Sequence, residues 1–384
     1  MLRSRILFIE DCVPHPSMGS GFPRAHKILS QMVDLGYFVT FYPLTTPAKL
    51  TDKTSFDVPA EVEIVLDHTA SQLGEFLKSR ETYYDIVWIS RPHNLKIFNQ
   101  VVSTQKLSLS GVQLIYDAEA IFCLREFEQQ RLKGNLPSET VMQARLRQEL
   151  NLSTPHCATI VTVCEPEQQI FSRHGHPNVE VLGHTLKATP TPANFHERRH
   201  ILFIGAIYSF NSPNTDSVIW FVNHIFPKIQ KKLGSAITLN VVGTHTIDIT
   251  SQLARSGIQD SVRLLGKVED LAEIYNQHRL FIAPTRFAAG ISHKVHEAAA
   301  HGLPVVTTPL IAKQLQWQPD TDILVAKQSE DFSRQCIQLY EDEALWTHLR
   351  ENALKKVKRE CSPQQFSQKL AMILRDACRH EVID

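Results

Sequence analysis

The chain has 384 residues, of which 43% are hydrophobic and 21% are charged, and its 40 basic residues balance its 40 acidic ones. This length favours two domains. The absence of a basic excess argues against nucleic acid as a partner. The seven cysteines include no Cys-x-x-Cys pair, so the sequence predicts neither a disulfide framework nor a zinc site.

The first half alternates apolar runs of strand length with amphipathic segments. RILFIED, at residues 5–11, predicts a strand. After a loop, residues 24–36 show the apolar spacing of a helix that ends at Gly36. Further strands are predicted at 37–43, 85–91, 112–120, 159–165 and 179–184, with a polar helical segment over about 120–150.

The first apolar run of the chain is not expected to be a signal peptide. The run ends in Glu10 and Asp11, which makes it too short and too acidic for a signal peptide. No segment approaches the length of a membrane-spanning helix. We therefore expect a cytoplasmic protein, and the pattern leaves peripheral contact with the inner face of a membrane open.

The second half repeats the strand–helix alternation. Residues 187–199 are polar, contain Pro190 and Pro192 and lack a hydrophobic period, so we interpret them as a linker. HILFIGAI (200–207) restarts the pattern, and DSVIWFVNHIFPKIQKKLG (216–234) predicts one long helix. Strands at 237–243 and 262–266 and a helix at 271–278 follow.

The alternation predicts the α/β class, with two doubly wound Rossmann-like domains facing a cleft. The expected boundaries are an N-terminal domain over 1–186, the linker over 187–199 and a second domain over 200–360. The C-terminal segment, 361–384, is expected to form a helix that packs back on the N-terminal domain.

The most informative stretch is RFAAGISHKVHEAAAHGLPVV, residues 286–306. It predicts a strand–loop–helix–strand unit, in which the loop and the helix start lie where parallel sheets bind ligands. Gly290 allows close backbone approach, and Lys294 in the first turn suits a phosphate. Glu297 lies on the same helix face and could accept hydrogen bonds from a ribose diol. The spacing alone fits an ordinary Lys–Glu surface pair equally well.

With these residues in place, the chain resembles the retaining GT-B glycosyltransferases of family 4. The resemblance is carried by FIGAIYSFNSPNTDSVIWFVNHIFPKI, by VRLLGKVEDLAEIY and by the 286–306 stretch. It implies a nucleotide-sugar donor domain in the second half and an acceptor-side domain in the first. It also implies that these residues bind the donor: Gly205, Asn214, Val268, Arg286, Gly290, Ile291, Lys294 and Glu297. Arg286 could instead be a structural partner.

The first half resembles the family less closely. Gly19-Ser20-Gly21 matches its glycine loop near the acceptor and the donor phosphates, with a flexible turn as the alternative, and Arg24 follows. His93 is a weaker candidate that could be a surface histidine. Asp117 and Glu119 end a predicted strand, where carboxylates suit a hydroxyl acceptor, unless Arg125 pairs with one of them.

Two positions and one stretch depart from the family pattern. Ala289 stands where the first glutamate of the family's pair would meet the sugar. The stretch AIYSFNSPN lacks the Arg and Lys that serve the diphosphate, so Lys294 must carry more of the phosphate charge, alone or together with Arg286 or His293. Glu119 stands where a histidine is common.

The resemblance implies a retaining transferase that moves a sugar from a nucleotide diphosphate sugar to a glycan or lipid-linked acceptor. Lys294, Asp117 and Glu119 are the expected catalytic residues. No Asp-x-Asp lies in a suitable loop, so we expect no metal, and no cofactor beyond the donor itself. The alternatives are a sugar-nucleotide epimerase or hydrolase of the same fold and a partner protein that has lost the chemistry. Neither first strand is followed by Gly-x-Gly-x-x-Gly, which argues against a nicotinamide enzyme.

Overall fold

The structure is a computed structural model that describes residues 4–15, 19, 21–45, 57–153, 156–253 and 259–379. Ser20 of the predicted glycine loop lies outside these residues. The chain forms two compact units. Unit 1 comprises residues 1–127, 137–185 and 364–384, and unit 2 comprises residues 128–136 and 186–363. Each unit contains one parallel sheet, so the predicted fold class of two doubly wound α/β domains is confirmed.

The sheet of unit 1 has seven parallel strands in the order β3-β2-β1-β4-β5-β6-β7. The strands are β1 (Arg5–Glu10), β2 (Phe38–Pro43), β3 (Glu63–Ile64), β4 (Ile86–Ser90), β5 (Gln113–Asp117), β6 (Cys157–Thr162) and β7 (Val179–Val181). The helices are α1 (Phe22–Asp34), α2 (Leu73–Ser79), α3 (Pro92–Gln105), α4 (Phe122–Leu132), α5 (Glu139–Leu150), α6 (Glu165–Arg173) and α15 (Pro363–Arg379), with short 3₁₀ turns at Ala70–Gln72 and Asn151–Ser153. The last residues of α4 are grouped with unit 2.

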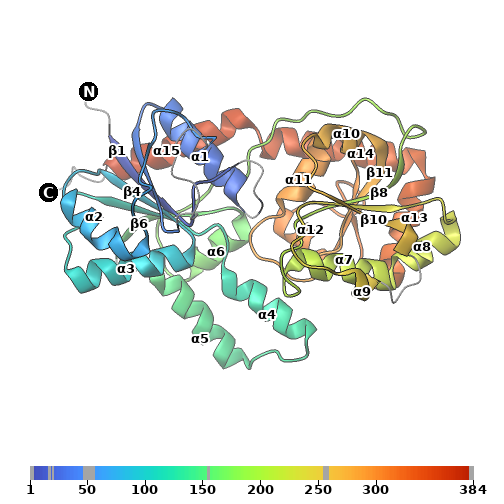
Figure 1. Ribbon diagram of the computed structural model, residues 1–384, viewed down its shortest axis with the longest axis horizontal. Coiled ribbons are helices and arrows are strands. Elements are labelled where there is room, and N and C mark those ends of the chain that lie inside the picture. The colour runs from blue at the N-terminus through green and yellow to red at the C-terminus, as the bar shows by residue number, and fades with distance from the viewer. Residues whose placement is uncertain are drawn as a thin grey trace. The chain divides into compact units, whose positions relative to one another are not determined.

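Alternate residues of β1 pack on opposite faces of this sheet, as the period of a strand requires. Leu7 and Ile9 join the core beneath α2 and α3, and Ile6 and Phe8 join the core beneath α1 and α15. Figure 1 shows these helix pairs on the two sides of the sheet. The apolar stripe of α15, which includes Leu370, is buried in the α1 core. The end of the chain is therefore part of unit 1.

The sheet of unit 2 has six parallel strands in the order β10-β9-β8-β11-β12-β13. The strands are β8 (Arg199–Ile204), β9 (Leu239–Val242), β10 (Val262–Gly266), β11 (His278–Ala283), β12 (Val305–Thr307) and β13 (Leu324–Val325). The helices are α7 (Pro213–His224), α8 (Phe226–Leu233), α9 (Thr250–Leu253), α10 (Leu271–Gln277), α11 (His293–Ala300), α12 (Pro309–Leu315), α13 (Ser329–Glu341) and α14 (Glu343–Glu360), with a 3₁₀ turn at Gln259–Ser261.

The long helix predicted over 216–234 is two helices. α7 ends at His224, and α8 begins at Phe226 with Pro227 in its first turn. Proline cannot donate a backbone hydrogen bond and its ring crowds the preceding turn, so it is tolerated at a helix start but not in a helix interior. The apolar pattern continues across the break because α7 and α8 both pack on one core.

The segment expected as a linker, residues 187–199, packs on unit 2. The Thr189 amide donates to the Ala300 carbonyl, and the Thr191 amide donates to the His301 carbonyl. The Arg198 side chain is fully buried and donates to main-chain carbonyls, among them that of Tyr275 at 2.7 Å. These hydrogen bonds tie the segment to the helices that follow it in the chain.

The strand orders place a topological switch point in each unit. In unit 1 the chain moves outward from β1 to β3 and then returns to place β4 on the other side of β1. In unit 2 the same reversal occurs between β8 and β11. Ligands of doubly wound proteins bind at the carboxyl ends of strands beside such reversals, so the residues after β1, β4, β8 and β11 are the first to consider.

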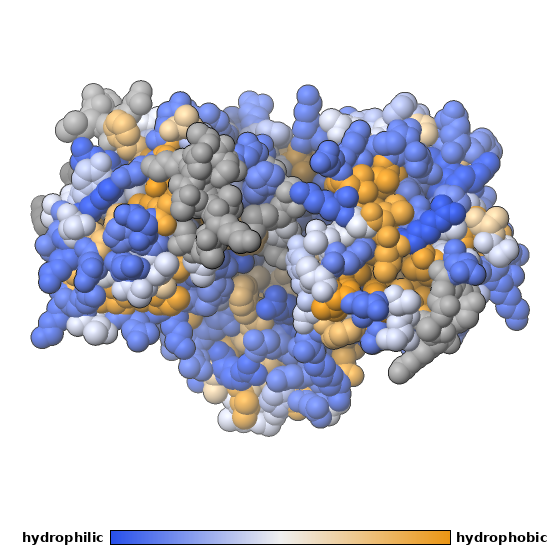
Figure 2. All heavy atoms as spheres, viewed as in Figure 1, coloured by the Kyte–Doolittle hydropathy of each residue, from blue (hydrophilic) through white to orange (hydrophobic). Residues whose placement is uncertain are grey.

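Hydrophilic residues predominate on the face of the molecule seen in Figure 2, with hydrophobic residues showing mostly between them. Among the described residues, no helix combines the length and apolar composition needed to cross a membrane.

Candidate functional site

In unit 2, the predicted phosphate-binding segment lies at the switch point. β11 ends at Ala283, and α11 begins at His293 after a loop in which Gly290 has a φ of +72°. That conformation suits glycine, because a β-carbon would be strained there. Ser292 precedes α11 without capping it through its side chain. The amide groups of the first helical turn have no intrahelical acceptors, and this end of the helix dipole favours an anion.

Lys294 is partly buried, and the neighbours described for its ammonium group are uncharged. Its Nζ donates a hydrogen bond to Oδ1 of Asn214 and lies 4.4 Å from the centre of the Phe203 ring. A β-carbon on Gly205 would lie 2.9 Å from this Nζ, so the glycine leaves room for the lysine. Burial lowers the pKa of Lys294 to about 7. A cation held in this way gains from an anionic ligand, because the ligand would replace its lost hydration.

Arg286 is held differently. Its guanidinium forms a two-pronged ion pair with the Asp216 carboxylate, with Nε 2.9 Å from Oδ2, and lies over the ring of Trp220. The pair neutralises the arginine within the protein. Arg286 thus has a structural partner, which was one of the two roles that the sequence left open for it. Lys294, in contrast, forms none of the described ion pairs with a carboxylate.

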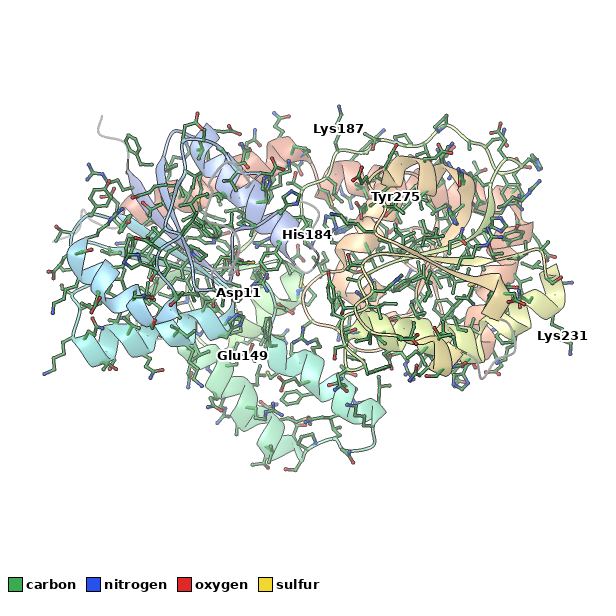
Figure 3. All side chains as sticks on the ribbon, in the orientation of Figure 1. Asp11, Glu149, His184, Lys187, Lys231 and Tyr275 are labelled. Carbon is green, nitrogen blue, oxygen red and sulfur yellow. The ribbon has the colours of Figure 1, made fainter. Side chains whose placement is uncertain are left out.

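Glu297 lies one turn after Lys294 and is partly buried. The described ion pairs include none between these two side chains, because the lysine bonds to Asn214 instead. Tyr275 of α10, labelled in Figure 3, is fully buried and stacks on the His301 ring at 4.4 Å. Burial and the neighbouring Glu297 carboxylate raise the pKa of Tyr275. Glu297 is therefore not a solvated surface residue.

The other positions expected to bind the donor lie at the same edge of the sheet. Gly205 follows β8, and its amide donates to the Val242 carbonyl at 2.8 Å. Val268 follows β10, and Ile291 lies in the loop before α11. Both pack on the core that contains Val295 of α11. The residues predicted to bind the donor thus share one strand edge, and their individual roles stay predictions.

In unit 1, Arg91 lies at the centre of a cluster of carboxylates. It follows β4 and is 8% exposed. Its Nε lies 2.9 Å from Glu10 and 3.3 Å from Glu119, and its Nη1 lies 3.2 Å from Asp11. These residues come from the carboxyl ends of β1, β4 and β5. Sequence reasoning assigned no role to Glu10, Asp11 or Arg91, although their positions directly after buried strands were a usable signal.

His93 in the first turn of α3 joins this cluster from its exposed side. Its Nε2 lies 2.5 Å from Oδ1 of Asp11, and its side chain is 47% exposed. Figure 3 labels Asp11, which directly follows β1. Hydrogen bonding to His93 and the charge of Arg91 lower the pKa of Asp11, although its partial burial opposes this shift.

Glu119 is the most strained carboxylate of the cluster. Its φ is +52°, which is uncommon for a residue with a β-carbon. Its side chain is 10% exposed, and burial raises its pKa to about 7 although Arg91 opposes the shift. Burial also raises the pKa of Glu10 well above its ordinary value. A carboxyl group that titrates near neutrality suits general acid–base chemistry.

Gly21 fits closely against Glu119. Its φ is +85°, and a β-carbon there would lie 2.6 Å from a Glu119 carboxylate oxygen. The second glycine of the predicted loop is therefore required both by its backbone conformation and by this contact. Gly19 is exposed, and a β-carbon there would meet nothing within 4 Å. The surroundings of Gly19 therefore leave room for a larger side chain.

Asp117 and Arg24 form a buried ion pair. Nη1 of Arg24 lies 2.6 Å from Oδ2 of Asp117, and both side chains are at most 1% exposed. Nε of Arg24 donates to the Leu182 carbonyl at 2.9 Å. The carboxylates at this strand end thus pair with Arg24 and Arg91, whereas Arg125 lies over the Phe122 ring. Of the two predicted catalytic carboxylates, Glu119 has the greater freedom to exchange a proton.

Comparisons with known proteins agree with this architecture. Residues 198–342 match the family model described as glycosyl transferases group 1. The comparison with curated proteins finds no match. Among solved structures, Alr3699/HepE from Anabaena, in complex with UDP and glucose, aligns with a TM-score of 0.71 at 15% identity, covering 97% of this chain and 100% of that one.

Two further structures are similar over nearly their whole length. Sucrose-phosphate synthase from Thermosynechococcus elongatus aligns with a TM-score of 0.71 at 14% identity, covering 97% of this chain and 99% of that one. WaaG, a glycosyltransferase involved in lipopolysaccharide biosynthesis, aligns with a TM-score of 0.68 at 15% identity, covering 94% and 98%. The chain therefore has the GT-B fold of these proteins, and residues 198–342 carry the sequence pattern of group 1 glycosyl transferases.

Proposed function

We propose that this protein is a retaining glycosyltransferase that moves a sugar from a nucleotide diphosphate sugar to a hydroxyl group of a glycan or lipid-linked acceptor. One observation carries the proposal. Lys294 has no carboxylate partner among the described ion pairs, and it lies at the start of α11 inside the segment that matches the group 1 family model. The retention of anomeric configuration follows from the resemblance to family 4.

On the donor side, Lys294 and the first turn of α11 would bind the diphosphate, and Glu297 would accept hydrogen bonds from the ribose hydroxyls. When the bond from the sugar carbon to the diphosphate oxygen breaks, negative charge develops on the leaving group. A positioned cation and helix amides stabilise that charge at low cost, because they need no reorganisation at the moment of reaction. This arrangement supports transfer without a metal ion.

On the acceptor side, Glu119 is the better candidate to take the proton of the attacking hydroxyl group. Its pKa of about 7 is near the optimum for a general base at neutral pH, whereas Asp117 is paired with Arg24. The acceptor oxygen forms the new bond to the sugar carbon as the diphosphate leaves. The proton passes either to Glu119 or to the departing phosphate. Gly21 lies against this carboxylate, and His93 belongs to the same cluster.

The donor and the place of action are also proposals. UDP-glucose is the first donor to test, because Alr3699/HepE has been solved with UDP-glucose bound. We place the reaction in the cytoplasm or at the inner face of the membrane, where a lipid-linked acceptor would be available.

The test begins with binding. Titration calorimetry with UDP and UDP-glucose, with and without EDTA, should show binding by the wild-type protein that EDTA does not change. Lys294→Ala should weaken binding at least tenfold, because the cation that opposes the diphosphate is lost. Lys231→Ala is the matched control, since Lys231 is an exposed lysine of α8 in the same unit (Figure 3). Equal affinities for the two variants would contradict the proposed donor site.

Transfer is measured separately, with radiolabelled donor and cell-envelope glycan or glycolipid acceptors. Glu119→Gln should reduce turnover while UDP affinity is kept. Unchanged turnover would remove Glu119 from the mechanism.

A second candidate function is a non-catalytic partner protein that has kept the fold. Ala289 in place of a glutamate and the absence of Arg and Lys in residues 206–214 favour it. Binding of nucleotide without transfer to any acceptor would support this second function.

A further inference from the structure

The first turn of α7 contacts both cations of the predicted donor site. Asn214 bonds to Lys294, and two residues later Asp216 forms the ion pair with Arg286. One cation therefore has a neutral partner, and the other has a charged one. The chain places Lys294 and Asn214 80 residues apart, so this pairing exists only in the folded unit.

Each end of the Asn214 amide group makes one hydrogen bond. Its Nδ2 donates to the Ala206 carbonyl at 3.0 Å, and its Oδ1 accepts from Lys294. Both contacts require the same orientation of the amide, because a carbonyl oxygen needs a donor and an ammonium group needs an acceptor. The side chain thus links the main chain after β8 to the lysine of α11.

The helix that carries Asn214 is firmly placed. Oγ of Ser212 accepts from the Thr215 amide at 3.3 Å and caps α7, and Pro213 occupies the first turn. Thr215 and Ser217 are fully buried, and the Ser217 hydroxyl donates to the Pro213 carbonyl. A rigid helix start of this kind can hold a partner side chain within the narrow limits that ligand binding requires.

We propose that Asn214 is a positioning residue that holds Lys294 at the diphosphate site while leaving its positive charge unneutralised. This inference rests on the proposed function, since it assigns the lysine to a nucleotide diphosphate. An aspartate at position 214 would have almost the same shape but would form an ion pair with Lys294. The phosphate would then have to compete with that carboxylate. An alanine would leave the charge but release the side chain.

The charges around Lys294 allow this role. The other titratable residues of its own helix are His293, His296 and Glu297, and on α7 the charged residue that follows Asn214 is Asp216, which is paired with Arg286. From β8 and the residue after it, the lysine meets Phe203 and Gly205, which are uncharged. Burial alone accounts for the lowered pKa of Lys294, so a single new carboxylate would change its titration clearly.

The first test measures the lysine directly and needs no nucleotide. NMR titration of protein labelled with ¹³C at lysine Cε should give Lys294, assigned by its loss in Lys294→Arg, a pKa of about 7 in the wild type. Asn214→Asp should raise that pKa by roughly two units, through the neighbouring negative charge. Asn223→Asp is the matched control, because Asn223 lies on α7 but donates to the Gln252 carbonyl. An unchanged Lys294 pKa in Asn214→Asp would overturn the inference.

The second test measures UDP binding at pH 7 and pH 8, a range above the last phosphate ionisation, near pH 6, and below the pH at which the uracil ring loses its proton. Wild-type affinity should fall about fivefold, as the protonated fraction of Lys294 falls from about one half to about one tenth. Asn214→Asp should bind at least tenfold more weakly at pH 7 and vary much less with pH. Asn214→Ala should bind several-fold more weakly and keep the pH dependence.

The outcomes separate the two proposals. If the wild type binds UDP but Asn214→Asp matches it in affinity and pH dependence, the positioning role is wrong and the proposed function stands. If the wild type binds none of UDP, ADP and GDP, the proposed function is overturned and this inference with it. Far-UV circular dichroism and the melting temperature of each variant identify losses of binding caused by unfolding.

Discussion

The Glu119→Gln substitution should stabilise the protein at alkaline pH, even though we expect it to impair turnover. In the folded chain, burial raises the pKa of Glu119 from its ordinary value of 4.5 to about 7. Between these values the folded protein holds a proton that the unfolded chain has released, so stability falls as the pH rises through this range. Glutamine has no charge to bury and escapes this penalty.

The size of the penalty follows from the two pKa values. A difference of about 2.5 pKa units corresponds to roughly 3 kcal/mol in the free energy of unfolding. Only about 1 kcal/mol of it is present at pH 5, and nearly all of it is present at pH 8. The advantage of Glu119→Gln over the wild type should therefore grow by about 2 kcal/mol from pH 5 to pH 8.

Hydrogen–deuterium exchange of peptides from β1, β4 and β5 measures this difference within unit 1, with exchange rates corrected for pH. Glu75→Gln is the control, because Glu75 is an exposed glutamate of α2 in the same unit. A Glu119→Gln variant whose advantage is the same at pH 5 and pH 8 would show that Glu119 is already charged in the folded protein. The assignment of a neutral-pH base to this residue would then be wrong.

Three further outcomes are expected. Arg24→Met should destabilise unit 1 by about 3–5 kcal/mol in urea unfolding, because it leaves Asp117 buried without its partner. Adding Asp117→Leu should recover most of this loss. A double variant no more stable than Arg24→Met would contradict the reasoning. Gly21→Ala should lower the melting temperature by several degrees, since it introduces about 1–3 kcal/mol of backbone strain and a clash with the Glu119 carboxylate. An unchanged melting temperature would show that the loop adapts. Arg286→Met should lower the UDP affinity measured by calorimetry less than Lys294→Ala does, because the arginine is already neutralised by Asp216. A larger loss of affinity would show that Arg286 binds the donor.

The sequence by itself determined the class of fold and placed the predicted donor-binding segment at the carboxyl edge of the second sheet. The spacing of apolar residues repeats as strand and helix in both halves, and this local period is set by the geometry of each element. Gly290, Lys294 and Glu297 lie within eight residues of one another, so a single loop and helix fix their relation. For this reason the position of the segment at the start of α11 could be predicted before any tertiary contact was known.

Tertiary structure alone decided the partners of the charged side chains. Arg24 meets Asp117 93 residues away, and Lys294 meets Asn214 80 residues away, so no local pattern indicates either pair. Arg91 follows β4 and pairs with carboxylates that follow two other strands, because the strand order places β4 between β1 and β5. Which charges are neutralised, and which remain open to a ligand, depends on the order of the strands in the sheet and on burial, and neither is encoded in the spacing of residues along the chain.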